Sequence, residues 1–328
     1  MVLILTRQDI RRVLTIRDAI SAVEDAFREL SSGAAVMPTR IGLSIPEKDG
    51  WMGAMPAYLG RTNALVTKIV TSYGGNPSKH NLPTVMAIIV LNNPETGKPE
   101  AVLEGGFITA VRTGAASGVA TKYLARKDAR VVGIFGAGTQ ARTQLEAIRE
   151  VRDLRSAIVY DIIKERAERF AEEMSSSLGI GISAVGSPER ALEGSDVVVT
   201  ASTSKTPVFD GDNLQEGTHI NAIGSFTPDA RELDDSTVRR SKIVVDSLQA
   251  ALAEAGDIVI PMRSGAIQRS QIYAELGEIV AGIKPGRTDD REITVFKSVG
   301  LAVQDAATAR LAYMKARKAK IGTDIELM

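Results

Sequence analysis

A glycine-rich segment in the middle of the chain has the residue types and spacing of a dinucleotide-binding turn. In GAGTQA, Gly136 and Gly138 directly follow the apolar run RVVGIF and lead into TQARTQLEAIRE, which has a helical composition. The first glycine permits a tight turn, the second lets a pyrophosphate approach the backbone, and Ala141 allows the helix to pack closely on the strand. The first amides of the helix, near Thr139 and Gln140, then face the phosphates. We therefore predict a strand, turn and helix that bind a dinucleotide.

An acidic residue, Asp161, ends the next apolar run, SAIVYD. At this place a carboxylate accepts hydrogen bonds from the hydroxyls of the adenosine ribose, which favours NAD over NADP. Lys164 and Arg166 follow closely and suit a 2′-phosphate, so the use of NADP stays open. The alternative, a glycine turn with a purely structural role, is disfavoured because the strand, the helix and the acidic residue occur together.

Other residues expected near the cofactor follow later apolar runs. In an open parallel sheet, ligands bind at the carboxyl ends of the strands. An isolated serine or threonine at such an end is also an ordinary helix N-cap, so both interpretations stand. The residues at the ends of DVVVTA, THINAIG and ITVFKS are Ser202, Thr203, Ile223, Gly224 and Ser298.

Three cations in the first third of the chain are candidates for binding a small carboxylate. Arg40 opens a strand-like run, Lys68 interrupts the apolar run LVTKIV, and Arg112 lies in an alanine-rich segment. Strand alternation puts Lys68 on the same face as Val66, which favours a cleft over an outward-facing edge. The planar fork of an arginine suits two-point binding of a carboxylate. Without further information, a solvated or salt-bridged residue is the commoner interpretation of each.

Asp229 follows Pro228 in the segment GSFTPDARELDD, after the run THINAI. A carboxylate near the expected nicotinamide end can relay a proton in acid/base catalysis, although it can equally cap the next turn. His219 lies within a buried run and is interpreted as a core residue, and His80 as a loop residue.

Composition excludes several classes of protein. Lys plus Arg and Asp plus Glu number 40 each, so no basic excess is left for a nucleic acid or an acidic membrane surface. The chain has no cysteine and only two histidines, which disfavours disulfides and a zinc or iron site. No apolar run approaches a membrane span or a signal-peptide core, so we expect a cytoplasmic protein.

The elements that must position these residues fall into two groups. Residues 15–30 predict an amphipathic helix with Thr15 and Asp18 as a capping box, and residues 40–104 predict an antiparallel sheet. From residue 129 on, apolar runs alternate with helical segments, which predicts a parallel sheet with helices on both faces. The seven runs expected to form its strands are ARVVGIFG, SAIVYD, ISAVG, DVVVTAS, THINAIG, SKIVVDS and ITVFKS. Further helices are expected at residues 107–124 and 302–318.

We therefore predict an α/β protein with a doubly wound Rossmann-type parallel sheet and a smaller α+β domain. The length of 328 residues fits two domains. The expected bounds are residues 1–112, with 305–328 returning to them, for the substrate-binding and dimerisation domain. Residues 113–304 are expected to form the NAD(P)-binding domain.

Together these residues resemble the ornithine cyclodeaminase/mu-crystallin family, and the likeness runs over essentially the whole chain. Segments such as NPETG, EGTHINAIG, KIVVD and GEIVAGIKPGR look most like archaeal-type alanine dehydrogenases. The matching landmarks in chain order are Met55-Pro56, Lys68, LPTVMA at 82–87, RTGAA at 112–116, GAGTQA at 136–141, HINAIG at 219–224, PDARELD at 228–234 and SVGLAVQD at 298–305.

The resemblance implies a homodimer formed by the N-terminal sheet domain and chemistry at a carbon–nitrogen bond next to a carboxylate. It implies that Arg40, Lys68 and Arg112 hold the substrate, that Thr84 and Arg112 lie near the cofactor, and that Lys68 takes part in catalysis. Asp229 or a water would handle the proton. Cofactor and partners are then NAD or NADP and a small α-amino or α-imino acid.

Several activities stay open within this resemblance. Alanine dehydrogenase and a pyrroline-2-carboxylate or related ketimine reductase are nearly tied. Ornithine cyclodeaminase ranks third, because Gly53 and Ala54 stand where cyclodeaminases carry a glutamate. Phe226 stands where they and archaeal alanine dehydrogenase place an aspartate, and the Phe-Thr-Pro-Asp sequence looks more like the imine reductases. A crystallin-like protein that binds NAD(P)H with little turnover is the alternative of another class.

Overall fold

The computed structural model describes residues 1–327. The chain divides into two compact units. Unit 1 comprises Met1–Arg112 and Leu301–Met328, and unit 2 comprises Thr113–Gly300. The predicted α/β class is confirmed, because one unit holds a parallel sheet and the other a mixed α+β arrangement.

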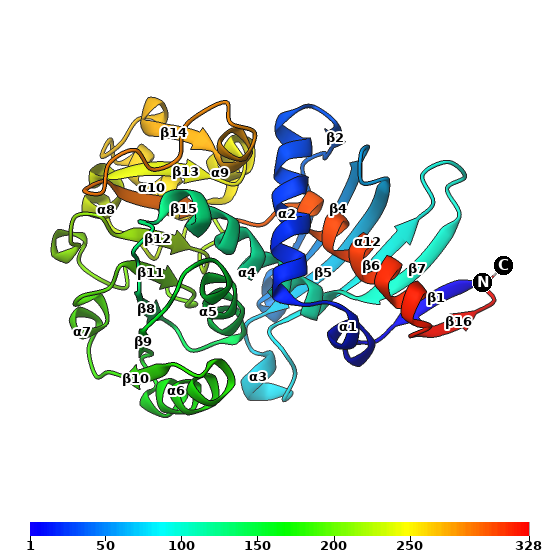
Figure 1. The fold of residues 1–328 in the computed structure, drawn as a ribbon, viewed down its shortest axis with the longest axis horizontal. Coiled ribbons are helices and arrows are strands. Elements are labelled where there is room, and N and C mark those ends of the chain that lie inside the picture. The colour runs from blue at the N-terminus through cyan, green and yellow to red at the C-terminus, as the bar shows by residue number, and fades with distance from the viewer. Residues whose placement is uncertain (328) are drawn as a thin grey trace. The chain divides into compact units, whose positions relative to one another are not determined.

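Unit 1 is built on an eight-stranded sheet whose central strands are antiparallel, as predicted (Figure 1). The exception is the first strand of the chain, β1 (Val2–Leu5), which pairs parallel with β7 (Pro99–Glu104) and was not predicted. The sheet order is β16 (Thr323–Ile325), β1 (Val2–Leu5), β7 (Pro99–Glu104), β6 (Val85–Asn92), β5 (Ala64–Tyr73), β4 (Gly50–Leu59) and β2 (Ala35–Val36), with β3 (Ile41–Ile45) paired to β4.

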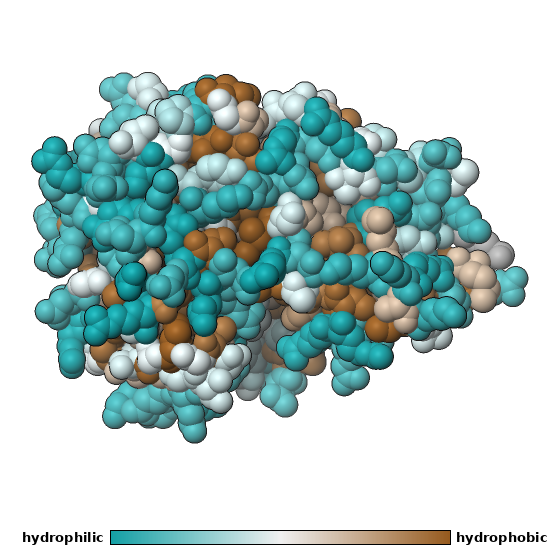
Figure 2. Space-filling model, in the orientation of Figure 1, coloured by the Kyte–Doolittle hydropathy of each residue, from teal (hydrophilic) through white to brown (hydrophobic). Residues whose placement is uncertain are grey.

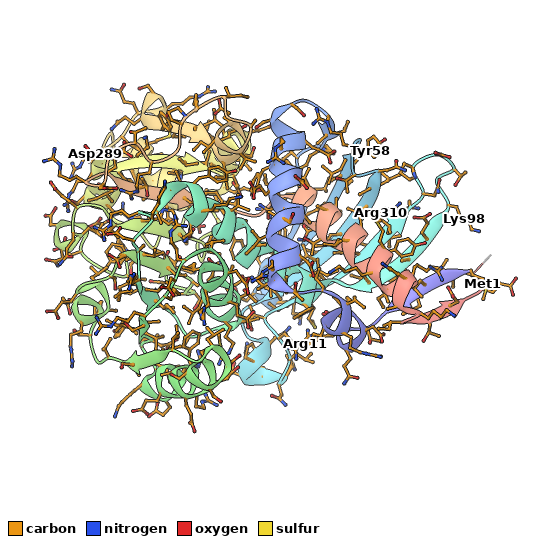
Figure 3. The ribbon with its side chains drawn as sticks, viewed as in Figure 1. Met1, Arg11, Tyr58, Lys98, Asp289 and Arg310 are labelled. Carbon is orange, nitrogen blue, oxygen red and sulfur yellow. The ribbon has the colours of Figure 1, made fainter. Side chains whose placement is uncertain are left out.

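Two helices cover one face of this sheet. The predicted capping box is confirmed, since Thr15 and Asp18 exchange side-chain and backbone hydrogen bonds at the start of α2 (Ile16–Ser31). The C-terminal helix α12 (Ala302–Ala319) packs on α2, β4 and β5. Arg310 extends from α12 (Figure 3), and its Nη1 lies 3.0 Å from Glu100 Oε2 on β7. The smaller helices of unit 1 are α1 (Arg7–Val13), η1 (Pro46–Lys48) and α3 (Asn76–Lys79).

The other face of the unit 1 sheet carries exposed apolar side chains. In Figure 1, α2 and α12 lie in front of the sheet, so the space-filling view of Figure 2 shows the helical layer, which is mainly hydrophilic with small apolar patches. Ile41 and Leu43 on β3 are 73% and 59% exposed, and Ile88 on β6 is 48% exposed. Successive side chains of a strand point to opposite faces of its sheet. The face that α2 and α12 do not cover is therefore partly apolar.

Unit 2 is built on eight parallel strands, which confirms the predicted doubly wound sheet. All seven predicted runs are strands, and the short β14 (Ile272–Glu275) was not predicted. Chain order reverses between β8 (Val131–Phe135) and β11 (Val197–Thr200), the kind of position where dinucleotides bind. The order is β10 (Gly181–Ala184), β9 (Ser156–Tyr160), β8 (Val131–Phe135), β11 (Val197–Thr200), β12 (His219–Ala222), β15 (Ile293–Lys297), β13 (Ser241–Val245) and β14 (Ile272–Glu275).

Apolar cores lie on both faces of the parallel sheet. Leu145 and Phe170, from α5 (Thr139–Val151) and α6 (Lys164–Leu178), belong to one core. Ala251 and Ile258, from α9 (Leu248–Glu254) and α10 (Gly256–Arg263), belong to the other. Gly114 lets α4 approach α5, because a Cβ there would lie 2.3 Å from the Thr143 carbonyl oxygen. The helices are α4 (Gly105–Leu124, which begins in unit 1), α5 (Thr139–Val151), α6 (Lys164–Leu178), α7 (Pro188–Leu192), η2 (Gly211–Asn213), α8 (Asp235–Arg240), α9 (Leu248–Glu254), α10 (Gly256–Arg263), η3 (Arg269–Gln271) and α11 (Leu276–Val280).

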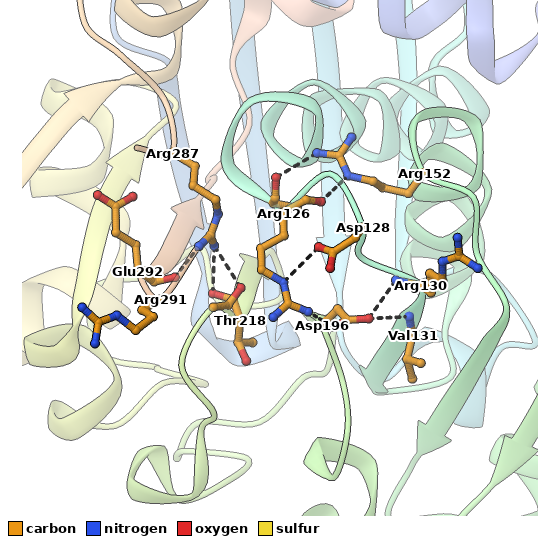
Figure 4. Close-up of polar contacts among 12 residues, drawn as sticks. Arg126, Asp128, Arg130, Val131, Arg152, Asp196, Thr218, Arg287, Arg291 and Glu292 are labelled. Carbon is orange, nitrogen blue, oxygen red and sulfur yellow. Dashed lines mark hydrogen bonds and ion pairs between the residues drawn. The ribbon is translucent and has the colours of Figure 1, made fainter. Parts of the chain in front are cut away.

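Arginines cap the carboxyl end of α4 in unit 2 (Figure 4). Arg152 donates to the carbonyl oxygens of Thr121 and Ala125 at 2.7 and 2.9 Å, and Arg287 donates to that of Leu124 at 2.6 Å. Cations at a helix carboxyl end satisfy its last carbonyls and its dipole. We therefore assign these arginines to the fold.

His219 is fully buried in β12, as predicted for a core residue. Its Nδ1 lies 2.9 Å from Thr294 Oγ1. Burial and the nearby Arg287 and Arg152 lower its pKa to about 3, so the ring is neutral and does not act as an acid near neutral pH. Within residues 1–327, no helix is both long and apolar enough to cross a membrane.

Candidate functional site

A buried carboxylate in unit 1 joins two of the three predicted cations. Lys68 is 1% exposed on β5, and its Nζ lies 2.6 Å from Asp305 Oδ2. Arg112, in α4, places Nε 3.1 Å from Asp305 Oδ1. Asp305 lies in the first turns of α12 and is fully buried. Lys68 therefore points to the buried face, on the same side as the buried Val66, as strand alternation predicted.

Gln304 holds the other side of the arginine. Its Oε1 accepts from Arg112 Nη1 at 2.7 Å and from the backbone N–H of Leu301 at 3.3 Å. Sequence reasoning missed both Gln304 and Asp305, although they end the landmark SVGLAVQD. The available signal was an amide and a carboxylate at the start of an alanine-rich helix.

Arg40 completes the group of cations. It lies just before β3, with its guanidinium 5.6 Å from the centroid of the Trp51 ring. Burial is the largest cause that lowers the pKa of Lys68, Asp305 raises this pKa, and the charges of Arg112 and Arg40 lower it, so that the pKa of Lys68 is about 8. Three cations and one carboxylate leave this part of unit 1 electropositive, which suits an anionic ligand. Thr84 directly precedes β6, and its carbonyl oxygen accepts from Tyr73 N at 2.9 Å.

The glycine turn of unit 2 has the geometry that a dinucleotide needs. Gly136 has a φ of 97°, and a Cβ there would lie 2.7 Å from the Ala201 carbonyl oxygen, so only glycine fits. Gly138 is the N-cap of α5, and a Cβ built on it meets nothing within 4 Å. The α5 amino end, which starts with Thr139 and Gln140, therefore has open space in front of Gly138. A pyrophosphate fits this arrangement.

Asp161 lies against this turn. Its Oδ2 accepts from Ala137 N at 2.9 Å and its Oδ1 from Ile163 N at 2.9 Å. Each carboxylate oxygen has a second lone pair, so both stay able to accept from a ribose hydroxyl. Ile162, directly after it, is 88% exposed.

A buried glutamate that the sequence analysis missed ties together two predicted cofactor loops. Glu232 Oε1 accepts from the backbone N–H and the hydroxyl of Ser202 at 2.7 and 2.6 Å. Its Oε2 accepts from Gly224 N at 2.8 Å. Ser202 follows β11 and Gly224 follows β12, so one side chain fixes the carboxyl ends of two adjacent strands. Ile223 is buried beside Gly224, and Thr203 is exposed.

Two further buried charges support Glu232. Asp257 Oδ1 accepts from the N–H groups of Glu232 and Leu233 at 2.7 and 2.8 Å. Lys297 Nζ lies 2.8 Å from Asp257 Oδ2 and donates to the Ser225 carbonyl oxygen. Burial and the nearby Asp257 raise the pKa of Glu232.

Ser298 has a defined structural partner. Its hydroxyl donates to the buried Asp246 at 2.8 Å, which also accepts from Val299 N and Gly300 N. The predicted contact between Ser298 and a cofactor therefore has to coexist with this bond.

Asp229 lies on an exposed loop. A hydrogen bond from Thr227, its own backbone and the charge of Lys205 lower its pKa. Near neutral pH this side chain is a carboxylate, which accepts protons and hydrogen bonds and does not donate them. Of the two predicted catalytic residues, Lys68 is the one whose pKa suits a donor.

The comparisons with known proteins agree with this arrangement. The model of the ornithine cyclodeaminase/mu-crystallin family matches residues 2–320. An alanine dehydrogenase from Archaeoglobus fulgidus is 43% identical over 324 residues, which cover 99% of this chain and 98% of the relative. The solved structure of Thermococcus litoralis Delta(1)-pyrroline-2-carboxylate reductase with NADH and L-proline is 53% identical to this chain, with a TM-score of 0.97. The match covers 98% of this chain and 100% of the reductase chain.

A second solved structure is an archaeal alanine dehydrogenase dimer with bound NAD. It is 42% identical to this chain and has a TM-score of 0.94, and the match covers 100% of this chain and 99% of the dehydrogenase chain. The resemblance inferred from sequence landmarks is thus confirmed: the chain belongs to the ornithine cyclodeaminase/mu-crystallin family.

Proposed function

We propose that this protein uses NADH to reduce the C=N bond of a cyclic α-imino acid of the pyrroline-2-carboxylate type, and catalyses the reverse oxidation. It is an NAD(P)-dependent oxidoreductase acting on the C–N bond of a small α-amino or α-imino acid. The observation that carries the proposal is the buried Lys68, Arg112 and Asp305 cluster. The choice of a cyclic imine is supported by the 53% identity with the reductase that was solved with NADH and L-proline.

The residues of unit 1 account for substrate binding and proton transfer. Arg112 and Arg40 bind the substrate carboxylate, and Lys68 Nζ gives its proton to the imine nitrogen. A bound reduced nicotinamide supplies the hydride that the imine carbon receives. The product is the amino acid, and Lys68 is left as a neutral amine that regains a proton from water. Asp229, as a carboxylate, is the second candidate group and would orient water.

The pKa of Lys68 predicts how the two directions depend on pH. Below about pH 8 the ammonium is present and can protonate the imine nitrogen. As the pH rises through about 8 the proton is lost, so kcat/KM for reduction falls. The oxidation of the amino acid needs the neutral amine as proton acceptor and gains over the same range.

The predicted cofactor residues fit NAD. Gly136 and Gly138 would hold the pyrophosphate, and Asp161 the adenosine ribose. Asp161→Ser is expected to lower the ratio of kcat/KM for NADH to that for NADPH by about 10-fold, because the carboxylate that repels a 2′-phosphate is gone. Steady-state kinetics with both cofactors measure this ratio. An unchanged ratio would remove the ribose assignment of Asp161.

The deciding experiment for the function is NADH consumption by the purified protein. One cuvette holds pyrroline-2-carboxylate, generated enzymatically, and the other holds pyruvate with ammonium. Faster loss with the cyclic imine supports the proposal. Faster loss with pyruvate would make the protein an alanine dehydrogenase, the activity named for the relative at 43% identity. No loss in either cuvette would leave ornithine cyclisation and then a binding protein with little turnover.

The structure gives a reason to rank ornithine cyclisation below both imine reduction and alanine dehydrogenation. Cyclodeaminases resembling this chain carry a glutamate just before the Met-Pro pair, where Gly53 and Ala54 stand. A Cβ built on Gly53 would lie 2.2 Å from the ring of Trp51. A side chain at this position therefore requires the indole ring to move, and with it the ring that Arg40 covers.

The face of the unit 1 sheet that α2 and α12 do not cover supports a homodimer. Its exposed apolar side chains include Ile41, Leu43 and Ile88, and such a surface favours burial against a second copy. An alanine dehydrogenase at 42% identity was solved as a dimer. Ile88→Glu is expected to shift the protein from dimer to monomer, measured by light scattering after gel filtration. Ile283→Glu, at an isoleucine of unit 2 that is also exposed, is the matched control, and a persistent Ile88→Glu dimer would exclude this face.

The proposed compartment is the cytoplasm. The chain has no cysteine with which to form the disulfides that are common in oxidising compartments. The proposed partners are NAD(H), a small amino or imino acid, and a second copy of the chain.

A further inference from the structure

Asp305 occupies a position that the proposed function does not yet explain. It is a fully buried carboxylate whose two oxygens contact Lys68 Nζ at 2.6 Å and Arg112 Nε at 3.1 Å. It lies in the first turns of α12, where the helix dipole favours a negative charge. A buried charge of this kind costs free energy unless it is paired, so its partners are part of the reason it is tolerated.

The surroundings of Lys68 explain what the carboxylate does. The neighbours across the sheet are Met55 on β4 and Ile89 on β6, both apolar and buried. The charged groups that face Lys68 are Asp305 from α12, Arg112 from α4 and Arg40 from the segment before β3. Burial and both arginines favour the neutral amine. Asp305 is the group that opposes them.

The same contacts determine which hydrogen-bond donors of Lys68 and Arg112 are already used within the protein. An ammonium has three N–H donors and a guanidinium has five. Asp305 takes one from Lys68 and the Nε donor of Arg112, and Gln304 takes one from Nη1 of Arg112. Within residues 1–327, the Nη2 edge of Arg112 and two N–H groups of Lys68 have no protein partner, so these donors can serve a ligand. The carboxylate thus fixes two long side chains while leaving each able to bind substrate.

We propose that Asp305 is a positioning residue that keeps Lys68 protonated and aims it, so that Lys68 serves as proton donor to the imine while Arg112 binds the substrate carboxylate. The inference rests on the proposed function, because it assigns to Lys68 the proton that the imine nitrogen receives. It assigns to α12, the element that follows unit 2 in the chain, control over the protonation of a residue on β5.

Asp305→Asn tests the inference by removing one charge with little change in shape. Without the carboxylate, Lys68 loses its proton at lower pH, so the descending limb of kcat/KM for imine reduction is expected to move by at least about one pH unit toward acid. At pH 8, where about half of the wild-type Lys68 is protonated, this corresponds to a loss of about 5-fold or more, and the loss approaches 10-fold at higher pH. The limb is measured with NADH in excess from pH 5 to pH 10. A lower rate with an unmoved limb would mean that Asp305 has only a structural role, and would overturn the proposal.

Glu100→Gln is the matched control. It also replaces an acid by its amide and removes an ion pair of α12, with Arg310 at 3.0 Å, but that pair does not touch Lys68. In this variant the descending limb of kcat/KM is expected to lie at the same pH as in the wild type. A similar shift in Glu100→Gln would show that loosening α12 moves the limb, and would also overturn the proposal.

A second variant covers the case in which Asp305→Asn does not fold. Gln304→Glu keeps both hydrogen bonds of Gln304 and adds a carboxylate against Arg112. The added charge offsets Arg112, so the limb is expected to move toward higher pH, and an unmoved limb would contradict the inference. Wild-type protein that turns over no imino or keto acid would instead contradict the proposed function, so the two failures are distinguishable.

Discussion

Lys68→Met is expected to lower kcat/KM for imine reduction by about 100- to 10,000-fold, the usual contribution of a positioned general acid. Methionine keeps the length and the apolar contacts of the lysine stem, but it has no proton to give. The cofactor turn with Gly136 and Asp161 belongs to unit 2, so NADH affinity is expected to stay within about two-fold of wild type. Steady-state kinetics and a fluorescence titration with NADH measure the two quantities.

Stability must be followed in the same experiment. The variant leaves Asp305 buried with Arg112 as its remaining ion-pair partner, and breaking a buried pair costs up to about 3–5 kcal/mol. Lys68→Arg is the control, because it keeps the charge opposite Asp305. A Lys68→Met protein that retains wild-type turnover would exclude Lys68 as the donor. A loss of NADH affinity with turnover otherwise intact would place Lys68 with the cofactor.

Much of the fold could be predicted because its signals are local. The alternation of apolar runs with helical segments predicted seven of the eight parallel strands, and the glycine turn was placed correctly between β8 and α5. Strand alternation also predicted that Lys68 shares a buried face with Val66. The strands that were missed, such as β1 and β14, are short and have no periodicity to distinguish them.

The partners of the site residues could not be predicted in the same way. Lys68 and Asp305 are 237 residues apart, and no local pattern of either segment refers to the other. In PDARELD, the sequence favours the aspartate after proline for catalysis because its loop follows the run THINAI, near the expected nicotinamide end. The structure shows that Asp229 is exposed, whereas Glu232 is buried and bonded to two loops. Burial of a polar side chain depends on tertiary packing, so sequence spacing does not distinguish these two acids.

Glu232→Ala is expected to weaken NADH binding by about 10-fold or more and to destabilise unit 2. The backbone N–H groups of Ser202 and Gly224 would lose their acceptor, and each buried unsatisfied donor costs about 1–3 kcal/mol. A loop misplaced by the loss of one such bond, worth about 1.4 kcal/mol, accounts for a tenfold change in affinity. Thermal unfolding and NADH titration measure the two effects.

Glu232→Gln distinguishes the contact of Glu232 with the Ser202 loop from its contact with the Gly224 loop. The glutamine oxygen can still accept from Ser202, but the amide nitrogen then faces Gly224 N, so only one contact is lost and the effect on NADH affinity should be smaller than for alanine. Asp235→Asn is the matched control in the same segment, since its ion pair with Arg231 is partly exposed and worth at most about 1 kcal/mol. If Glu232→Gln and Asp235→Asn changed stability and NADH affinity equally, the buried glutamate would have no special part in holding the loops that follow β11 and β12. If only the Glu232 variants weaken NADH binding, the landmark PDARELD serves the cofactor through its glutamate.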